Sequence, residues 1–393
     1  MGPLAILLLL ISCAAPTKPG LPSSHDLSPT PARSSLPTEV VMNEGAGRGD
    51  LLTVMLRIGM DGEEYPFILD TGAPGTLFDR SLESKLTRLP LGIWTVQTLN
   101  EKQKSAVYVQ PALYLGNVPL VTGKLAATFD MKQLSSAIGR PIRGVLGMDC
   151  LRHYCIQLDF EAQRVRFLDP SSPRSAKPGT PFPVTFSFLG EKPSINHPGL
   201  MGGTASACEI DTGFNLDGED DLGTFHAINN GVGRIPSCAW NGDTYDDLLV
   251  GNSRSDNRLG LRFLARHLVT LDFPNRTLYL QRRRAGPLRT EQATAEGNAA
   301  AQSALNFLRN LLSENRLPGW SAGDEPATRD VRFHLDLPNN ALCDGLWKKG
   351  DPSVYHYELA RASKSSPWVL QKAWRTDENG KTVQEYQMPT KMP

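Results

Sequence analysis

The chain has 393 residues, and its 41 Lys and Arg balance its 41 Asp and Glu, so the formal net charge at pH 7 is zero. Hydrophobic residues account for 40% and charged residues for 21%, a composition that is typical of folded globular proteins and excludes a largely disordered chain. The balanced charge and the lack of a sustained basic patch argue against a nucleic-acid partner. The 35 Gly and 30 Pro favour many turns and short strands, so we expect a mainly β fold.

The N-terminus carries a short apolar run, Leu4–Ile11, which is shorter than the ~20 residues that span a bilayer. Small residues follow it, so residues 1–15 are predicted to form an export signal. The run Leu10-Ile11-Ser12-Cys13 resembles a bacterial lipobox, which predicts a lipid anchor at Cys13; simple cleavage nearby is the alternative. Residues 16–48 are rich in Pro, Ser, Thr and Gly, which predicts a flexible tether. We therefore expect an exported protein of the periplasm or cell envelope, in contact with the membrane only through such an anchor.

An internal repeat organises the middle of the chain. Leu158-Asp159-Phe160 and Leu271-Asp272-Phe273 lie 113 residues apart. Each copy then ends in an alternation of apolar and other residues, which is typical of a strand with one buried face. The repeat predicts one lobe over residues 49–169 and a second lobe over residues 180–282.

Each copy also carries the triplet Asp-Thr-Gly directly after a short apolar run. The first is Asp70-Thr71-Gly72 and the second is Asp211-Thr212-Gly213, so the two Asp residues lie 141 positions apart. A single triplet of this kind is also an ordinary β-turn sequence, but two at matching points of a repeat favour a shared site. The two triplets lie 141 residues apart, but the two Leu-Asp-Phe motifs lie only 113 apart. The first copy therefore has 28 more residues (141 minus 113) between its triplet and its Leu-Asp-Phe motif, enough for a flap or for a helix at Met131–Ile138.

Two such triplets have a chemical rationale. When their loops face each other, two carboxylates lie about 3 Å apart and share one proton, because both cannot ionise there. The ionised carboxylate then acts as general base on a water, and the protonated one polarises a substrate carbonyl. Thr offers a hydroxyl that can lock one loop to the other, and Gly lets another backbone approach closely. This chemistry requires no metal or organic cofactor.

At these motifs the chain resembles the retropepsin-like and pepsin-like aspartic proteases. The segment Phe67–Ala73 resembles the active-site segment of that family, and Gly144–Asp149 resembles the hydrophobic-hydrophobic-Gly motif that crosses beneath it. A more divergent second copy is carried by Ile210–Gly213 and Leu259–Leu261, so the resemblance covers residues 50–282.

The resemblance implies two β-barrel lobes in a bilobal body, with the active site at their interface. It implies an aspartic endopeptidase that takes a peptide or protein substrate under a β-hairpin flap, which we place near Trp94–Val107. Its implied site consists of the catalytic pair, the interlocked threonines and the loop glycines: Asp70 and Asp211, Thr71 and Thr212, and Gly72 and Gly213.

Departures from the family pattern keep two alternatives open. Phe214 follows the second triplet where pepsin-like enzymes carry Ser or Thr, and Glu209 is unexpected in a strand that should be buried. One alternative is therefore a catalytically inactive peptide-binding or scaffolding protein that keeps the fold. Another is a homodimer in which two copies of Asp70 pair, whereas the two-lobe hypothesis favours a monomer. The acidic run Asp217–Asp221 suits either a Ca²⁺ site or a solvated loop.

The remaining residues, 296–393, are predicted to form a small α+β domain. Leu305, Leu308, Leu311 and Leu312 have helical spacing. Strand-like segments follow, and Asn379-Gly380 is a hairpin-turn signal ahead of the last of them.

Overall fold

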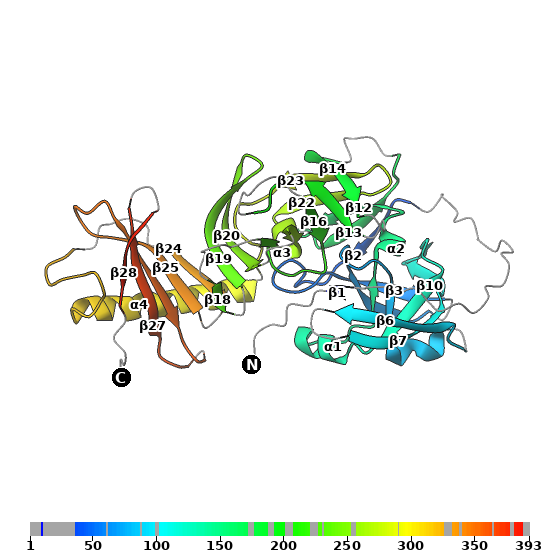
Figure 1. Ribbon diagram of the computed structural model, residues 1–393, viewed down its shortest axis with the longest axis horizontal. Helices are drawn as coiled ribbons and strands as arrows, with labels where there is room; N and C mark the ends of the chain where they lie inside the picture. Colours follow the sequence, from blue (N-terminus) through cyan, green and yellow to red (C-terminus); the bar gives the residue numbers. More distant parts are fainter. Residues whose placement is uncertain are drawn as a thin grey trace. The chain divides into compact units, whose positions relative to one another are not determined.

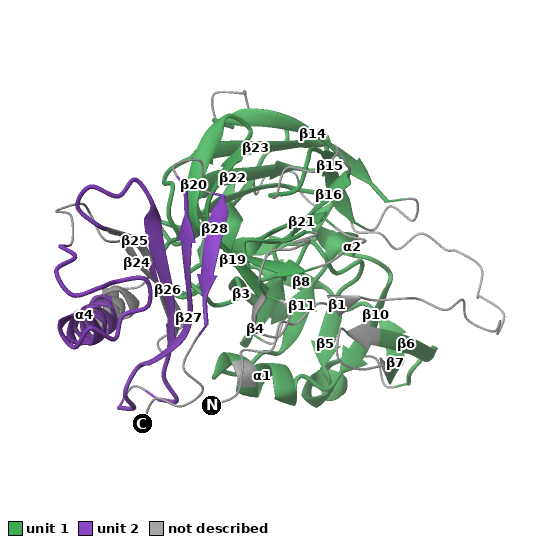
Figure 2. Cartoon of the chain, turned by 60° about the vertical axis from the view of Figure 1, so that its left-hand side comes forward, with its two compact units in different colours: residues 1–288 green, residues 289–393 purple. Residues whose placement is uncertain are grey.

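The computed structural model describes most of the chain beyond residue 35 and divides it into two compact units, residues 1–288 and 289–393 (Figure 2). The described residues are 9–10, 36–59, 62–86, 89–98, 102–171, 177–187, 192–200, 207–220, 227–229, 232–252, 257–289, 291–325, 332–337, 340–363, 365–377 and 381–387. Cys13 and the rest of the predicted signal lie outside them, apart from the short strand β1 (Leu9–Leu10).

Lobe 1 is built almost entirely of short strands, as expected from the abundance of Gly and Pro (Figure 1). Its elements are β2 (Thr38–Val41), β3 (Thr53–Ile58), β4 (Glu64–Leu69), β5 (Leu77–Asp79), a 3₁₀ helix (Arg80–Lys85), β6 (Gly92–Thr98), β7 (Lys102–Val109), β8 (Leu113–Leu115), β9 (Val118–Pro119), β10 (Leu125–Phe129), α1 (Lys132–Ile138), β11 (Gly144–Leu146), α2 (Met148–Leu151), β12 (Cys155–Asp159) and β13 (Arg164–Leu168).

Lobe 2 repeats this order with fewer residues. Its elements are β14 (Thr180–Phe186), β15 (Pro193–Asn196), β16 (Ala207–Asp211), β17 (Gly218–Asp220), β18 (Ala227–Asn229), β19 (Val232–Trp240), β20 (Asp243–Asn252), β21 (Asn257–Gly260), α3 (Leu261–Leu264), β22 (His267–Asp272) and β23 (Thr277–Arg282).

The strand pairing shows that the two lobes share one topology. Strand β4 pairs antiparallel with β3 and parallel with β11, and β16 pairs in the same way with β15 and β21. A short helix follows the parallel partner strand in each lobe, α2 after β11 in the first and α3 after β21 in the second. The helix expected in the longer first copy is α1.

A sheet between the lobes holds them together. Strand β12 of lobe 1 pairs antiparallel with β22 of lobe 2, and β13 and β23 extend this sheet on either side (Figure 1). Beyond these strands lie β2, which pairs with β13, and β14, which pairs with β23 and also with β15 of lobe 2.

The position of β2 corrects the predicted end of the tether. Strand β2 lies within residues 16–48, and the side chains of Met42 and Ala46 are buried in lobe 1. The folded part of the chain therefore begins before residue 49, because β2 completes the outer edge of the sheet that joins the lobes.

The expected mainly β architecture is confirmed, but the sheets are open. In the part of the chain that the structure describes, one sheet of ten strands carries most of lobe 1, and a sheet of thirteen strands carries lobe 2 together with β12, β13 and β2. Among the described residues neither sheet closes into the barrel that the resemblance implied, since each has two end strands. A continuous apolar core runs through both lobes and includes Phe67 and Phe263.

The second compact unit is α+β, as the pattern after residue 296 predicts. Its helix α4 (Glu291–Ser313) begins five residues earlier than that boundary. Ala300, Ala304, Leu308 and Leu311 form the buried stripe of this helix and share a core with aromatic residues such as Tyr357. The five strands that the structure describes in this unit form one antiparallel sheet: β24 (Arg332–Leu337), β25 (Asn340–Trp347), β26 (Val354–Ala360), β27 (Val369–Thr376) and β28 (Thr382–Tyr386). The predicted Asn379-Gly380 turn lies outside the described residues.

Across the described residues we found no helix that combines the length and apolar character needed to cross a membrane.

Candidate active site

The two Asp-Thr-Gly triplets lie at corresponding strand ends of the two lobes. Strand β4 ends at Leu69, and its neighbour β11 pairs Leu146 with Leu69. In lobe 2 the same register pairs Gly260 of β21 with Asp211. Because the residues directly before each Asp, Leu69 and Ile210, are apolar and buried, each strand delivers its Asp from the core to the point where the two lobes meet.

The threonines of the two triplets lock the loops to each other. The backbone N–H of Thr71 donates to Oγ1 of Thr212 at 3.0 Å, and the N–H of Thr212 donates to Oγ1 of Thr71 at 3.0 Å. The Thr71 hydroxyl donates to the carbonyl of Ile210 at 2.6 Å, and the Thr212 hydroxyl donates to the carbonyl of Leu69 at 2.8 Å. Both threonines are fully buried. These four reciprocal bonds hold the loops in one relative position.

The glycines of the triplets make room for the carboxyl group of the opposite lobe. A Cβ atom on Gly72 would lie 2.6 Å from Oδ1 of Asp211, and one on Gly213 would lie 2.4 Å from Oδ1 of Asp70. Each Gly N–H also donates to Oδ1 of the Asp in its own triplet at 2.8 Å. The glycines are therefore required by close approach, and each carboxyl group is held against the backbone of the other loop.

The structure thus brings together all six residues expected at the site. Asp70 and Asp211 are 3% and 4% exposed. Burial raises the pKa of the Asp70 carboxyl well above its usual range, and the charge of nearby Asp211 raises it further. The N–H groups of Gly72 and Ala73 act in the opposite direction but do not offset these effects. Asp70 therefore retains its proton at pH values where an exposed Asp has lost it.

The hydrophobic-hydrophobic-Gly motif supports each loop from below. In lobe 1 the N–H of Met148 donates to the carbonyl of Ala73 at 2.8 Å, and in lobe 2 the N–H of Leu261 donates to the carbonyl of Phe214 at 2.7 Å. Ala73 and Phe214 thus occupy equivalent positions, and both are buried. The departure at Phe214 leaves the geometry of the second loop intact.

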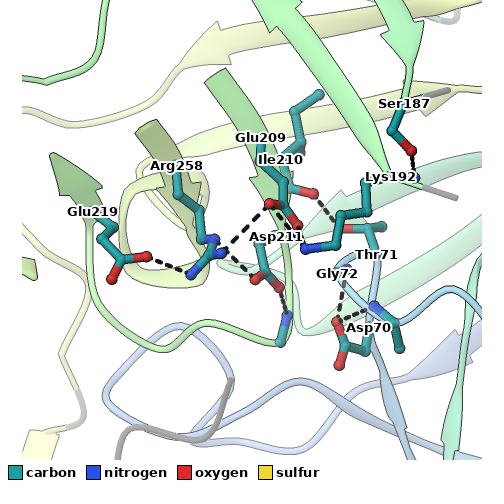
Figure 3. A network of polar contacts seen from close by, with 12 residues as sticks. Asp70, Thr71, Gly72, Ser187, Lys192, Glu209, Ile210, Asp211, Glu219 and Arg258 are labelled. Atoms are coloured by element: carbon teal, nitrogen blue, oxygen red, sulfur yellow. Dashed lines mark hydrogen bonds and ion pairs between the residues drawn. The ribbon is translucent and has the colours of Figure 1, made fainter. Parts of the chain in front are cut away.

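A charged cluster lies beside Asp211, and in the described part of lobe 1 the equivalent pair of positions is apolar, Ile68 and Val145. The central residue of the cluster, Arg258, was not predicted from the sequence. Arg258 Nε lies 3.3 Å from Oδ2 of Asp211, and its terminal nitrogens form ion pairs with Glu209 at 3.4 Å and Glu219 at 2.6 Å (Figure 3). Lys192 forms an ion pair with Glu209 at 3.0 Å. The sequence signal that could have indicated Arg258 was Glu209, because a carboxylate in a strand expected to be buried needs a cation nearby.

The described part of the acidic run after the second triplet, residues 217–220, is not a solvated loop, because residues 218–220 form strand β17. Asp217 is fully buried and forms ion pairs with Arg262 and Arg266. Within the described parts of the chain, no group of three or more His, Cys, Asp or Glu side chains is placed to hold a metal ion.

The segment expected to form the flap is a β-hairpin. Strands β6 and β7 pair antiparallel, with Trp94 opposite Ser105. The residues at its tip, 99–101, lie outside those described.

Comparisons with known proteins found similarity to one family model and to several solved structures. Residues 54–150 match the model of the family described as aspartyl protease. The aspartic proteinase from Irpex lacteus is 14% identical in sequence, with 65% of this chain and 99% of that chain covered and a TM-score of 0.43. Basic 7S globulin from soybean is 11% identical, with 62% of this chain and 94% of that chain covered and a TM-score of 0.42. A search among curated proteins found no match. The matched segment contains the first triplet and its supporting motif, which confirms that this chain resembles the retropepsin-like and pepsin-like aspartic proteases.

Proposed function

We propose that the chain is an aspartic endopeptidase that hydrolyses peptide bonds with a water activated by the Asp70/Asp211 pair. The observation that carries the proposal is the reciprocal placement of each carboxyl group against the Gly of the opposite triplet. Two buried carboxyl groups held in this way, one of them with a raised pKa, share a single proton.

The chemistry follows from that shared proton. The ionised carboxylate takes a proton from a bound water, whose oxygen attacks the amide carbon. The protonated carboxyl group gives its proton to the carbonyl oxygen, which produces a neutral tetrahedral diol. On collapse, the first carboxyl group protonates the leaving nitrogen, the C–N bond breaks, and a diol hydroxyl returns a proton to the second. Both groups thereby regain their starting states.

The substrate class that we propose is a peptide or protein segment in extended conformation. The β6/β7 hairpin belongs to the same lobe as Asp70 and is the element that we propose as the flap over such a segment. Among the described residues the outer edge of its strand β6 pairs with β1 only at Gln97 and Thr98, and the remaining main-chain groups of that edge are suited to pairing with an extended chain.

A second candidate is a peptide-binding or scaffolding protein without catalysis. The observation that favours it is the contact between Arg258 and Asp211, because a buried cation against one carboxylate can impede the exchange of protons that turnover needs. Lobe 2 of the same chain supplies the partner of Asp70, so we propose a monomer rather than a dimer that pairs two copies of Asp70.

The test is peptide hydrolysis by the full chain and by Asp70→Asn and Asp211→Asn, with Asp243→Asn in lobe 2 as a matched control, since Asp243 is exposed and distant in sequence from both triplets. We expect each site variant to lose at least 10³-fold in kcat/KM and the control to keep full activity, as expected for residues that act as one unit. Full activity in Asp211→Asn would exclude the shared pair. Peptide binding without turnover, unchanged in both site variants, would favour the scaffold.

We also propose export and a lipid anchor at Cys13, on the basis of the sequence of residues 1–15. Expression in a bacterial host with radiolabelled palmitate should label the native chain and leave Cys13→Ser unlabelled. Release of an unlabelled native chain into the soluble fraction would instead indicate simple signal cleavage.

A further inference from the structure

The two lobes differ at one pair of positions directly before the catalytic strand ends. In lobe 1, Ile68 of β4 pairs with Val145 of β11, and both are buried. In lobe 2, the pair in the same register is Glu209 of β16 and Arg258 of β21. An apolar pair in one copy of the fold is thus replaced by an ion pair in the other.

Stability alone does not account for this exchange. A buried ion pair pays a large desolvation cost, and its replacement by apolar residues is often neutral or stabilising. Lobe 1 shows that this fold accepts an apolar pair at these positions. Arg258 nevertheless has a side chain only 1% exposed, and its guanidinium lies over the ring of Phe214 as well as against three carboxylates. Its position is therefore best explained by what it does to those carboxylates.

The charged groups around Asp211 come from five elements. Arg258 comes from β21, Glu209 from β16, Glu219 from β17 and Lys192 from the segment before β15, and Asp70 faces Asp211 from the loop after β4 (Figure 3). The cation nearest to Asp211 is Arg258, at 3.3 Å, whereas Lys192 contacts Glu209. In the described parts of the chain no cation forms an ion pair with Asp70, and the strand pairs directly before it, Ile68 with Val145 and Leu69 with Leu146, are apolar.

We propose that Arg258 fixes the negative charge of the catalytic pair on Asp211 and leaves the shared proton on Asp70. The proposal deepens the proposed function, because it makes Asp211 the general base and Asp70 the general acid. Arg258 is a positioning residue: it acts through Asp211 and does not touch the substrate.

The electrostatic environment of each residue supports this assignment. Burial and the Asp211 charge raise the pKa of Asp70, which favours its protonated form. Burial alone would lower the pKa of Arg258, but the attraction of Asp211, Glu209 and Glu219 raises it, so the guanidinium stays charged. An opposite charge this close to a carboxyl group favours its ionised form over its protonated form.

The assignment sets the order of proton transfers. Asp211 takes the proton of the attacking water while Asp70 gives its proton to the carbonyl oxygen of the substrate. On collapse Asp211 passes its new proton to the leaving nitrogen, and Asp70 recovers one from the diol. Because the active form needs an ionised Asp211, Arg258 extends activity to lower pH.

The experiment follows the two carboxyl carbons of the full chain, labelled with ¹³C at Asp Cγ, through a pH titration by NMR. Asp70→Asn and Asp211→Asn assign the two signals. The key variant is Glu209→Ile with Arg258→Val, which gives lobe 2 the apolar pair that lobe 1 already has. Arg258→Lys is the matched control, since it keeps the charge. The pH profile of kcat/KM is recorded for the same proteins.

In the native chain we expect the Asp211 signal to titrate first, at lower pH than that of Asp70. In the double variant we expect the Asp211 midpoint and the acid limb of kcat/KM to move upward by about one pH unit or more, and in Arg258→Lys the native order to be kept. Titration of Asp70 first in the native chain, or an unchanged Asp211 midpoint in the double variant, would overturn the proposal. If the double variant does not fold, the order in which Asp211 and Asp70 titrate in the native chain and in Arg258→Lys decides the proposal.

The outcomes separate this inference from the proposed function. If Asp211 ionises first but the chain shows no turnover, the inference about Arg258 stands and the protease proposal is rejected. If the chain is an active protease but Asp70 ionises first, the protease proposal stands and the role of Arg258 is rejected.

Discussion

Gln157 and Thr270 pair with each other at the centre of the sheet that joins the two lobes. They face each other in the register of β12 and β22, and Gln157 Nε2 donates to Oγ1 of Thr270 at 3.2 Å. Their positions differ by 113, the same offset that relates the two copies of the repeat. The pair therefore lies on the axis of internal symmetry, and the sheet around it helps to bring the two triplets face to face.

The glycines of the triplets should tolerate no side chain. We expect Gly213→Ala to lower kcat/KM by about 10²-fold or more, because its Cβ would lie 2.4 Å from the Asp70 carboxyl and displace a reacting group. Gly75→Ala, in the lobe 1 loop, is the control, since its Cβ would meet no atom within 4 Å. Peptide hydrolysis checks both variants, and native activity in Gly213→Ala would mean that the loops move apart freely.

The threonine lock should contribute to stability as well as to geometry. Thr71→Val removes the hydroxyl that donates to Ile210 and accepts from the Thr212 N–H, leaving two buried polar groups without partners. We expect this change to lower the free energy of unfolding by about 2–4 kcal/mol. Thr71→Ser keeps the hydroxyl and should cost much less. Denaturant unfolding measures both, and equal losses would assign the effect to the Thr methyl group.

Acid should weaken lobe 2 through His267. Its Nδ1 donates to the carbonyl of Phe263 at 3.1 Å, and its Nε2 accepts from the Tyr245 hydroxyl at 2.8 Å. Burial lowers the pKa of His267 to about 4. Between about pH 6.5 and 4 the unfolded chain binds a proton that the folded chain does not, so stability falls as the pH drops, in total by on the order of 3 kcal/mol.

Hydrogen exchange of the β22 amides at pH 7 and pH 4 measures this loss. His267→Gln should remove that part of the pH dependence, whereas His356→Gln, in the second compact unit, should leave it unchanged. An equal loss of protection in His267→Gln and in the native chain would assign the acid effect to other groups.

The boundary of the folded part can be tested by truncation. A chain that starts at residue 49 lacks β2 and the buried side chain of Met42, so we expect it to lose about 2 kcal/mol or more of stability relative to a chain that starts at residue 36. Thermal unfolding of the two chains checks this expectation. Equal midpoints would show that β2 is dispensable for the fold.

Local pattern was sufficient for much of this molecule. The alternation of apolar residues that ends each copy of the repeat, the apolar run before Asp70 and the helical spacing around Leu308 all predicted elements that the structure contains: β13 and β23, β4, and α4. The same triplet at matching points of a repeat predicted which six residues would meet. Such inferences succeed because strand and helix periods, and the turn chemistry of Gly, are properties of neighbouring residues.

The sequence by itself thus determined the mainly β class, the two lobes and the residues of the candidate site. Only the tertiary structure decided that β2 belongs to the folded body, that the sheets stay open, and that Arg258 reaches Asp211. Arg258 and Asp211 lie 47 residues apart, and their contact depends on the parallel register of β21 and β16. A pairing of that kind is set by the packing of the whole lobe, because no local period relates strands that are distant in the chain.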